Sequence, residues 1–122
     1  MPQLLLPEIV ARQDGTGAVT ELESGGSLKL LTLNVTRILE HESLEVTVSG
    51  SPDREHWLSL AKFPRKFHCG TYSLWLDPAT YPGVHYLRVE WKMSRWGASD
   101  GGVLSAFSVS AEPAKALHAR AM

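Results

Sequence analysis

The single cysteine and five histidines are the residues of this chain that most directly suggest catalysis. A thiol activated by a neighbouring histidine base is a common nucleophile. His68 adjoins Cys69, but adjacent side chains of an extended segment point to opposite faces, so these two are not expected to meet. His56 and His85 remain conceivable partners across a sheet. Because a lone cysteine is usually a small buried hydrophobe, we predict no catalytic residue and no enzymatic activity.

Metal binding and cofactor binding are not predicted either. The candidate ligands are the histidines and four loop acids: His41, His56, His68, His85, His118, Asp53, Glu55, Asp77 and Asp100. None of the histidines has the spacing of C-x-x-C or H-x-x-x-H. The loop acids could supply a calcium ligand or two, but aspartate in a turn most often binds its own backbone. Gly15 and Gly17 complete no phosphate-binding fingerprint, so we expect neither a metal nor a cofactor.

The four tryptophans offer the clearest opportunity for binding. Trp57 and Trp91 have in-facing positions in their expected strands and are interpreted as core residues. Trp75 and Trp96, together with Tyr72, could instead form a flat aromatic platform for a sugar or a partner protein. The alternative is that these side chains pack under loops.

The elements that would position these residues are short strands. The clearest is Val84 to Ser94, where Leu87, Val89, Trp91 and Met93 share one face and polar residues occupy the other. The same alternation predicts four further strands. In each of them a set of residues shares one face: Leu44, Val46 and Val48; Tyr72, Leu74 and Leu76; Trp57, Ser59, Ala61 and Phe63; and Val103, Phe107 and Val109.

One segment allows two interpretations. In Leu28 to Val35, the residues Leu31, Leu33 and Val35 share a face, which favours a strand. The helix formers that follow make a helix over Leu28 to Glu42 the competitor, and we favour the strand because of its context.

Turn signals recur at roughly ten-residue spacing between these strands, which is typical of an antiparallel sandwich. We therefore predict an all-β, two-sheet β-sandwich, immunoglobulin-like or jelly-roll-like, with about seven to nine strands. The expected divisions are an N-terminal arm with a first short strand (1–27), the sandwich core (28–111) and a short C-terminal tail (112–122).

Size and charge exclude several classes of partner. The chain has 122 residues and 13.4 kDa, enough for one domain that needs no disulfide or metal. The formal net charge is -1, so neither nucleic acid nor an anionic membrane is expected as a partner. The apolar N-terminus is broken by Pro7 and Glu8 and has no positive leading region. We therefore expect cytoplasmic synthesis without a secretion signal, and incorporation into a particle stays open.

The residues from Leu44 to Val89 also carry a resemblance. The run L-E-V-T-V-S-G-S-P-D-R-E-H-W-L-S-L-A-K-F, then Gly70 before a strand, then Y-L-R-V-E-W, resembles small immunoglobulin-like β-sandwich proteins of bacterial and tailed-phage genomes. In those proteins a serine, proline and aspartate turn follows a strand, and a tryptophan opens the next one. The resemblance spans roughly residues 28 to 110. It implies a structural or interaction protein and carries over no catalytic residue.

These observations lead to two functional hypotheses. The first is a non-enzymatic, self-associating structural or accessory protein of a larger, phage-like assembly, with the apolar N-terminal arm and the alanine-rich tail exchanging with neighbouring copies. Its predicted interface residues are Leu4, Leu5, Leu6, Ile9, Val10 and Leu117. The second is a carbohydrate-binding or other ligand-binding module that uses Tyr72, Trp75 and Trp96.

Overall fold

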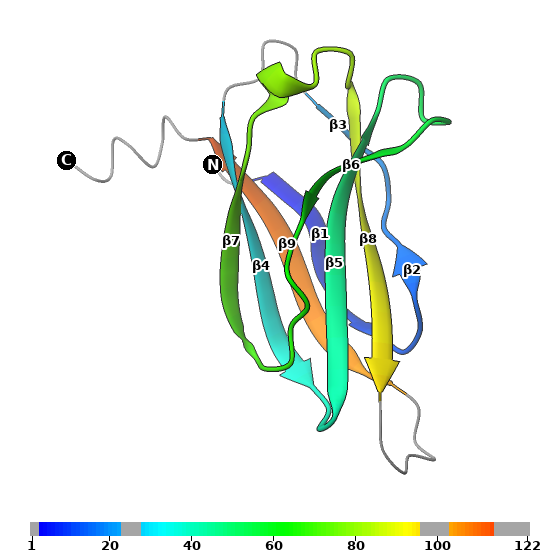
Figure 1. Cartoon of the computed structure of the whole chain (residues 1–122), viewed down its shortest axis with the longest axis vertical. Helices are drawn as coiled ribbons and strands as arrows, with labels where there is room; N and C mark the ends of the chain where they lie inside the picture. The colour runs from blue at the N-terminus through cyan, green and yellow to red at the C-terminus, as the bar shows by residue number, and fades with distance from the viewer. Residues whose placement is uncertain (1–2, 23–27, 96–102, 114–122) are drawn as a thin grey trace, which may run out of the picture.

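The computed structural model describes residues 3–22, 28–95 and 103–113. This part of the chain is an all-β sandwich of nine strands and one short 3-10 helix (Figure 1). The elements are β1 (Gln3–Ala11), β2 (Gly15–Thr16), β3 (Thr20–Glu21), β4 (Lys29–Ile38), β5 (Glu42–Ser51), β6 (Leu58–Lys62), β7 (Gly70–Leu76), η1 (Pro78–Thr80), β8 (Tyr86–Arg95) and β9 (Ser105–Pro113). The predicted two-sheet sandwich is confirmed.

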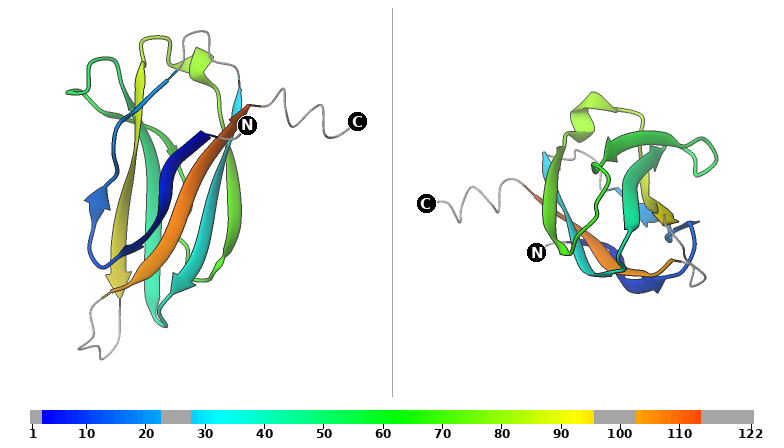
Figure 2. Two further views of the ribbon diagram at one scale, coloured as in Figure 1. Left: turned by 180° about the vertical axis from the view of Figure 1, so that it is seen from behind. Right: turned by 60° about the horizontal axis from the view of Figure 1, so that its bottom comes forward.

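The two sheets are antiparallel and face each other. One has the strand order β1-β9-β4-β7, and the other has the order β2-β8-β5-β6, with β3 also paired to β8. The connection from β8 to β9 crosses between the sheets, so these two strands lie in different sheets (Figure 2). In an immunoglobulin-like sandwich the last two strands pair within one sheet. The order found here is that of a jelly roll in which β2 and β3 together take the place of one strand.

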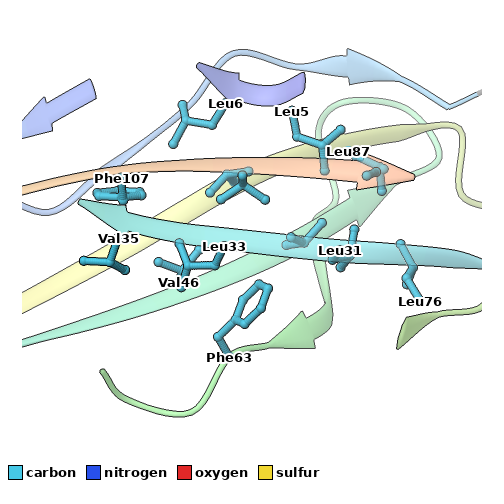
Figure 3. Packing of buried hydrophobic residues seen from close by; sticks show 14 of the residues in the cluster. Leu5, Leu6, Leu31, Leu33, Val35, Val46, Phe63, Leu76, Leu87 and Phe107 are labelled. Atoms are coloured by element: carbon cyan, nitrogen blue, oxygen red, sulfur yellow. The ribbon is translucent and has the colours of Figure 1, made fainter. Parts of the chain in front are cut away.

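The core lies between the inner faces of the central strands. Leu31, Leu33 and Val35 of β4 are fully buried at alternating positions, so the strand interpretation of this segment is correct and the competing helix is wrong. The residues predicted to face inward on β5 and on the first half of β8 are also buried. Figure 3 shows this packing for Leu5, Leu6, Leu31, Leu33, Val35, Val46, Phe63, Leu76, Leu87 and Phe107.

Trp91 closes one side of the core, as predicted for this residue. Its ring meets Phe107 of the opposite sheet edge to face, with centroids 5.6 Å apart, and its Nε1 donates to the Gln13 carbonyl over 2.9 Å. The indole also lies against the backbone of Gly15, where a Cβ would come within 2.7 Å of Trp91 Cζ2. The aromatic side chain therefore requires a glycine on β2.

The N-terminal segment forms β1, a full strand of the sandwich. It pairs with β9 along a register that runs from Gln3 opposite Ala111 to Ala11 opposite Ser105. A register shift between Leu4 and Leu6 lets two consecutive leucines, Leu5 and Leu6, both face the core. In this chain the segment is held within its own sheet.

A buried carboxylate joins two connections at one end of the sandwich. Glu42 is 1% exposed and accepts hydrogen bonds from the Leu104 N–H (2.7 Å), the Ser105 hydroxyl (2.7 Å) and the Leu39 N–H (3.3 Å). These three donors come from the turn before β5 and from the start of β9. Glu42 thus connects the two sheets through polar contacts, where the core supplies only apolar ones.

We expect Glu42→Ala to lower the free energy of unfolding by about 3 kcal/mol, because three donors would lose their acceptor and one of them, the Ser105 hydroxyl, is fully buried. Urea denaturation measures this difference. Glu40→Ala removes an exposed carboxylate two residues earlier and should change the free energy by no more than about 0.5 kcal/mol. Equal effects of the two substitutions would show that the contacts of Glu42 are not stabilising.

Candidate functional site

The outer face of the five-stranded sheet is hollowed into a polar groove of about 490 Å³. Its lining comes from residues that alternate with the buried ones on β5 and β8, and from the edge strand β6. We call this the charged groove and define it by Glu45, Thr47, Ser49, Trp57, Ser59, Lys62, Arg88, Glu90 and Lys92. The alternation in Val84 to Ser94 predicted that Arg88, Glu90 and Lys92 lie on the outer face of their strand. It did not predict that residues of β5 and β6 lie beside them.

Trp57 lies in the charged groove and not in the core as predicted. Register with β5 shifts between Val48 and Ser49, so that Ser59 and Ala61 oppose two consecutive residues of β5. This bulge changes the phase of the alternation along β6, so that Trp57 and Ser59, which precede the bulge, face outward. Trp57 is half-buried, and the Arg88 guanidinium lies over its ring, 4.1 Å from the centroid.

The turn before β6 fixes the orientation of Trp57. The Asp53 carboxylate accepts from the His56 N–H (2.9 Å) and the Glu55 N–H (2.8 Å), and its second oxygen lies 2.7 Å from His56 Nδ1. These contacts, led by the backbone hydrogen bond from His56, hold the pKa of Asp53 well below its usual range. The turn then presents the Arg54 carbonyl, which accepts from Trp57 Nε1 over 3.2 Å.

The same turn contains the closest grouping of potential metal ligands among the described residues, Asp53, Glu55 and His56. All three are exposed, and both Asp53 oxygens already bind groups of the turn itself. The expectation that aspartate here binds its own backbone is confirmed. The arrangement is explained by the turn, and we assign no metal to it.

Within the charged groove, each carboxylate has cationic or hydroxyl partners. Glu45 lies 3.7 Å from the Lys62 ammonium and 3.5 Å from the Arg65 guanidinium. Glu90 accepts from the Ser49 hydroxyl and lies 3.6 Å from Arg88 Nε. Ion pairs at the protein surface contribute little stability. The groove has more cationic side chains than carboxylates, so part of its positive charge is not neutralised within it.

The outer face of the other sheet has the opposite chemistry. We call it the uncharged face, and it consists of Leu4, Leu30, Thr32, Asn34, Thr71, Ser73, Trp75, Ser108 and Ser110. Trp75 is 57% exposed and is paired in register with Leu30 of β4. Figure 2 (left) shows this sheet from outside, with β7 at one edge. From Leu30 to Asn34 on β4 and from Thr71 to Trp75 on β7 the outward side chains are neutral, whereas Glu112 lies at one end of this sheet and Arg37 and Glu8 lie toward the other.

The predicted aromatic platform is not assembled within the described residues. Tyr72 and Trp75 are three positions apart on β7 and therefore face opposite sides of the sheet. Tyr72 points inward, where its hydroxyl donates to the His68 carbonyl over 2.8 Å and its ring lies under the Lys66 ammonium. Trp96 lies outside the described residues.

The predicted interface residues of the N-terminal segment separate into two groups. Leu4 and Val10 are exposed at 56% and 58%, and Leu5 and Leu6 belong to the core. Ile9 is half-buried and packs against the core. Leu117 lies outside the described residues.

Cys69 is exposed, contrary to the expectation of a buried hydrophobe. It precedes β7 and lines an open cavity of about 630 Å³ together with His41 and His68. The partners considered from the sequence, His56 and His85, adjoin the end of β5 and the start of β8, at the opposite end of the sandwich (Figure 1). They are therefore not brought to the thiol.

One further motif was missed in the sequence. Residues 97–101 read G-A-S-D-G, which has the spacing of the G-x-S-x-G nucleophile elbow. That elbow turns a strand into a helix, whereas this segment, outside the described residues, connects two strands of an antiparallel sandwich, β8 and β9. The fold context required by the motif is absent from the described part of the chain.

Comparison of the chain with known protein families, curated protein sequences and solved structures gives no significant match. In the described residues, no helix has the length and apolar character needed to cross a membrane.

We expect the stabilising effect of Asp53 to depend on pH. Because its pKa is depressed in the folded state, its contribution is present above the ordinary pKa near ~4 and is lost as the pH falls through the lower folded value. Asp53→Ala should therefore be less stable than wild type at neutral pH, and the difference should shrink in acid. Urea denaturation over an acid series measures this change.

Asp53→Asn serves as the matched control, because its side-chain carbonyl still accepts the backbone hydrogen bonds while the charge is gone. It should fall between wild type and the alanine variant at neutral pH. A difference between wild type and Asp53→Ala that is the same at every pH would contradict the assignment.

Proposed function

We propose that this chain is a non-enzymatic, self-associating structural or accessory protein, and that two copies pair through the edge strand β7. The observation that carries this proposal is the chemistry of β7, G-T-Y-S-L-W-L, which combines an open edge with the uncharged face. An unprotected edge strand offers a row of backbone donors and acceptors to another chain. Pairing with a second copy would satisfy these groups.

The other sheet edges carry the usual protection against such pairing. β1 contains Pro7 and two register shifts, and β6 is five residues long, with a register shift and Lys62 at its end. β2 and β3 have two residues each. β7 has seven residues, no proline, no charge and an unbroken register with β4. Among the described strands it is the edge best suited to pairing.

Antiparallel pairing of two β7 strands would produce a two-fold symmetric dimer. If the pair is centred on Ser73, this residue faces its own copy, and Trp75 of one chain lies opposite Thr71 of the other. The two uncharged faces would then join into one continuous surface without bringing like charges together. The exposed Trp75 would lie near the dimer interface, and removal of its apolar surface from water would favour association.

The proposal extends to assembly in a larger particle. The exposed Leu4 and Val10 provide further apolar contacts on the β1 side of the same sheet, at the edge opposite β7. The phage-like form of the assembly is suggested by the resemblance of residues 28 to 110 to small immunoglobulin-like sandwich proteins of bacteria and tailed phages, although the strand order of this chain is that of a jelly roll.

We expect wild type to have a solution mass of about twice 13.4 kDa in light scattering, and Ser73→Lys to be monomeric. Two lysines at the centre of the joint would repel each other and raise the dissociation constant by about tenfold or more. Thr16→Lys adds the same charge to an exposed position of the other sheet and should leave the mass unchanged. A monomeric wild type at every concentration, or equal masses for the two variants, would refute pairing through β7.

A further inference from the structure

We propose that the charged groove binds an acidic oligosaccharide, with the carboxylates of the sugar near Arg88 and Lys92. The groove lies on the outer face of the five-stranded sheet, whereas the proposed self-association uses an edge and a face of the other sheet. The two proposals are therefore independent, and either can fail alone. No residue of the originally predicted aromatic platform takes part.

The groove has the size and the polar groups that a short sugar chain requires. Its volume of about 490 Å³ lies within the range of small-ligand sites. Hydroxyls of Thr47, Ser49 and Ser59 line the floor, on neighbouring strands of the sheet. Sugar hydroxyls both donate and accept hydrogen bonds, and these side chains can do the same.

Arg88 is prepared to bind a carboxylate. Its guanidinium is stacked on the Trp57 ring, and the ring is itself fixed by the hydrogen bond from Nε1 to the Arg54 carbonyl. Arg88 Nε is buried and lies 3.6 Å from Glu90 Oε2 without a hydrogen bond among the described residues, so a ligand carboxylate would contact the terminal nitrogens of the guanidinium. A planar guanidinium held in this way has little conformational freedom left to lose when a ligand binds. Its geometry also suits bidentate contact with a carboxylate.

The charge balance of the groove favours an anionic ligand. Its cations are Lys62, Arg88 and Lys92, and its acids are Glu45 and Glu90. Glu45 already faces Lys62, and Glu90 already faces Arg88 and the Ser49 hydroxyl. Within the described part of the chain, Lys92 has no ion-pair partner. A ligand carboxylate would complete the set of charges at its ammonium.

Other anions fit the groove less well. Nucleic acid usually requires an extended cationic surface, and the formal net charge of this chain is -1. An acidic peptide in extended form would bind along the free edge of β6, whereas the groove lies across the outer face of β5 and β8. The hydroxyls of the floor favour a ligand that itself carries many hydroxyls, as a sugar chain does.

The experiment measures binding of a short oligogalacturonate to the full chain by calorimetry and by two-dimensional nitrogen–proton NMR of the tryptophan indoles. We expect saturable binding and a shift of the Trp57 indole signal, with no shift for Trp75. Lys92→Ala should weaken binding by about tenfold, as expected for loss of a charge-assisted contact. Arg37→Ala, which removes an exposed cation from the other sheet, should bind as wild type does.

The same measurements can overturn the proposal. An uncharged oligosaccharide of equal length and a short poly-glutamate serve as probes that lack either the charge or the sugar rings. The proposal fails if oligogalacturonate does not bind, if either probe binds equally well, or if Lys92→Ala and Arg37→Ala have the same effect. Trp75→Ala must leave binding unchanged, and a loss of binding in that variant would move the site to the uncharged face.

Discussion

The structure depends on one constraint, the burial of the inner faces of two sheets against each other. β4 and β9 on one side and β5 and β8 on the other supply fully buried leucine, valine and phenylalanine side chains at every second position. Each such side chain contributes about 1.5–3 kcal/mol when it leaves water. Because alternation sends every other residue outward, the same constraint determines which side chains the two outer faces can present.

The two outer faces differ because their strands carry different residues at the outward positions. On β8 these include Arg88, Glu90 and Lys92, on β5 they are mainly serine and threonine beside Glu45, and the groove gains further groups from the edge strand β6. On β4, β7 and β9 they are mainly serine, threonine and asparagine, with Trp75 and Leu30 at one end. A sandwich with this division can use one face for a charged ligand and the other for a chain of its own kind.

Much of the fold could be predicted from the sequence, because period-two alternation is a local signal. It located β5, β7 and β8 with their inner faces correctly, and it favoured a strand for β4. Trp57 was misplaced because a bulge changes the phase of β6, and bulges leave no clear local pattern. The groove was missed because it combines three strands whose neighbours are decided by pairing across the sheet. Likewise, nothing in the N-terminal segment itself reveals that its partner is β9.

The pairing of β1 with β9 has a consequence for synthesis. The last strand of the sandwich lies between β1 and β4, so the first strand has no neighbour until the ribosome has released residues near Ala111. Closing a contact between such distant parts of the chain is slow, and β1 lacks its strand partner during that time. A premature stop before Ser105 would remove the central pairing of this sheet, and the product would be exposed to proteases and to aggregation.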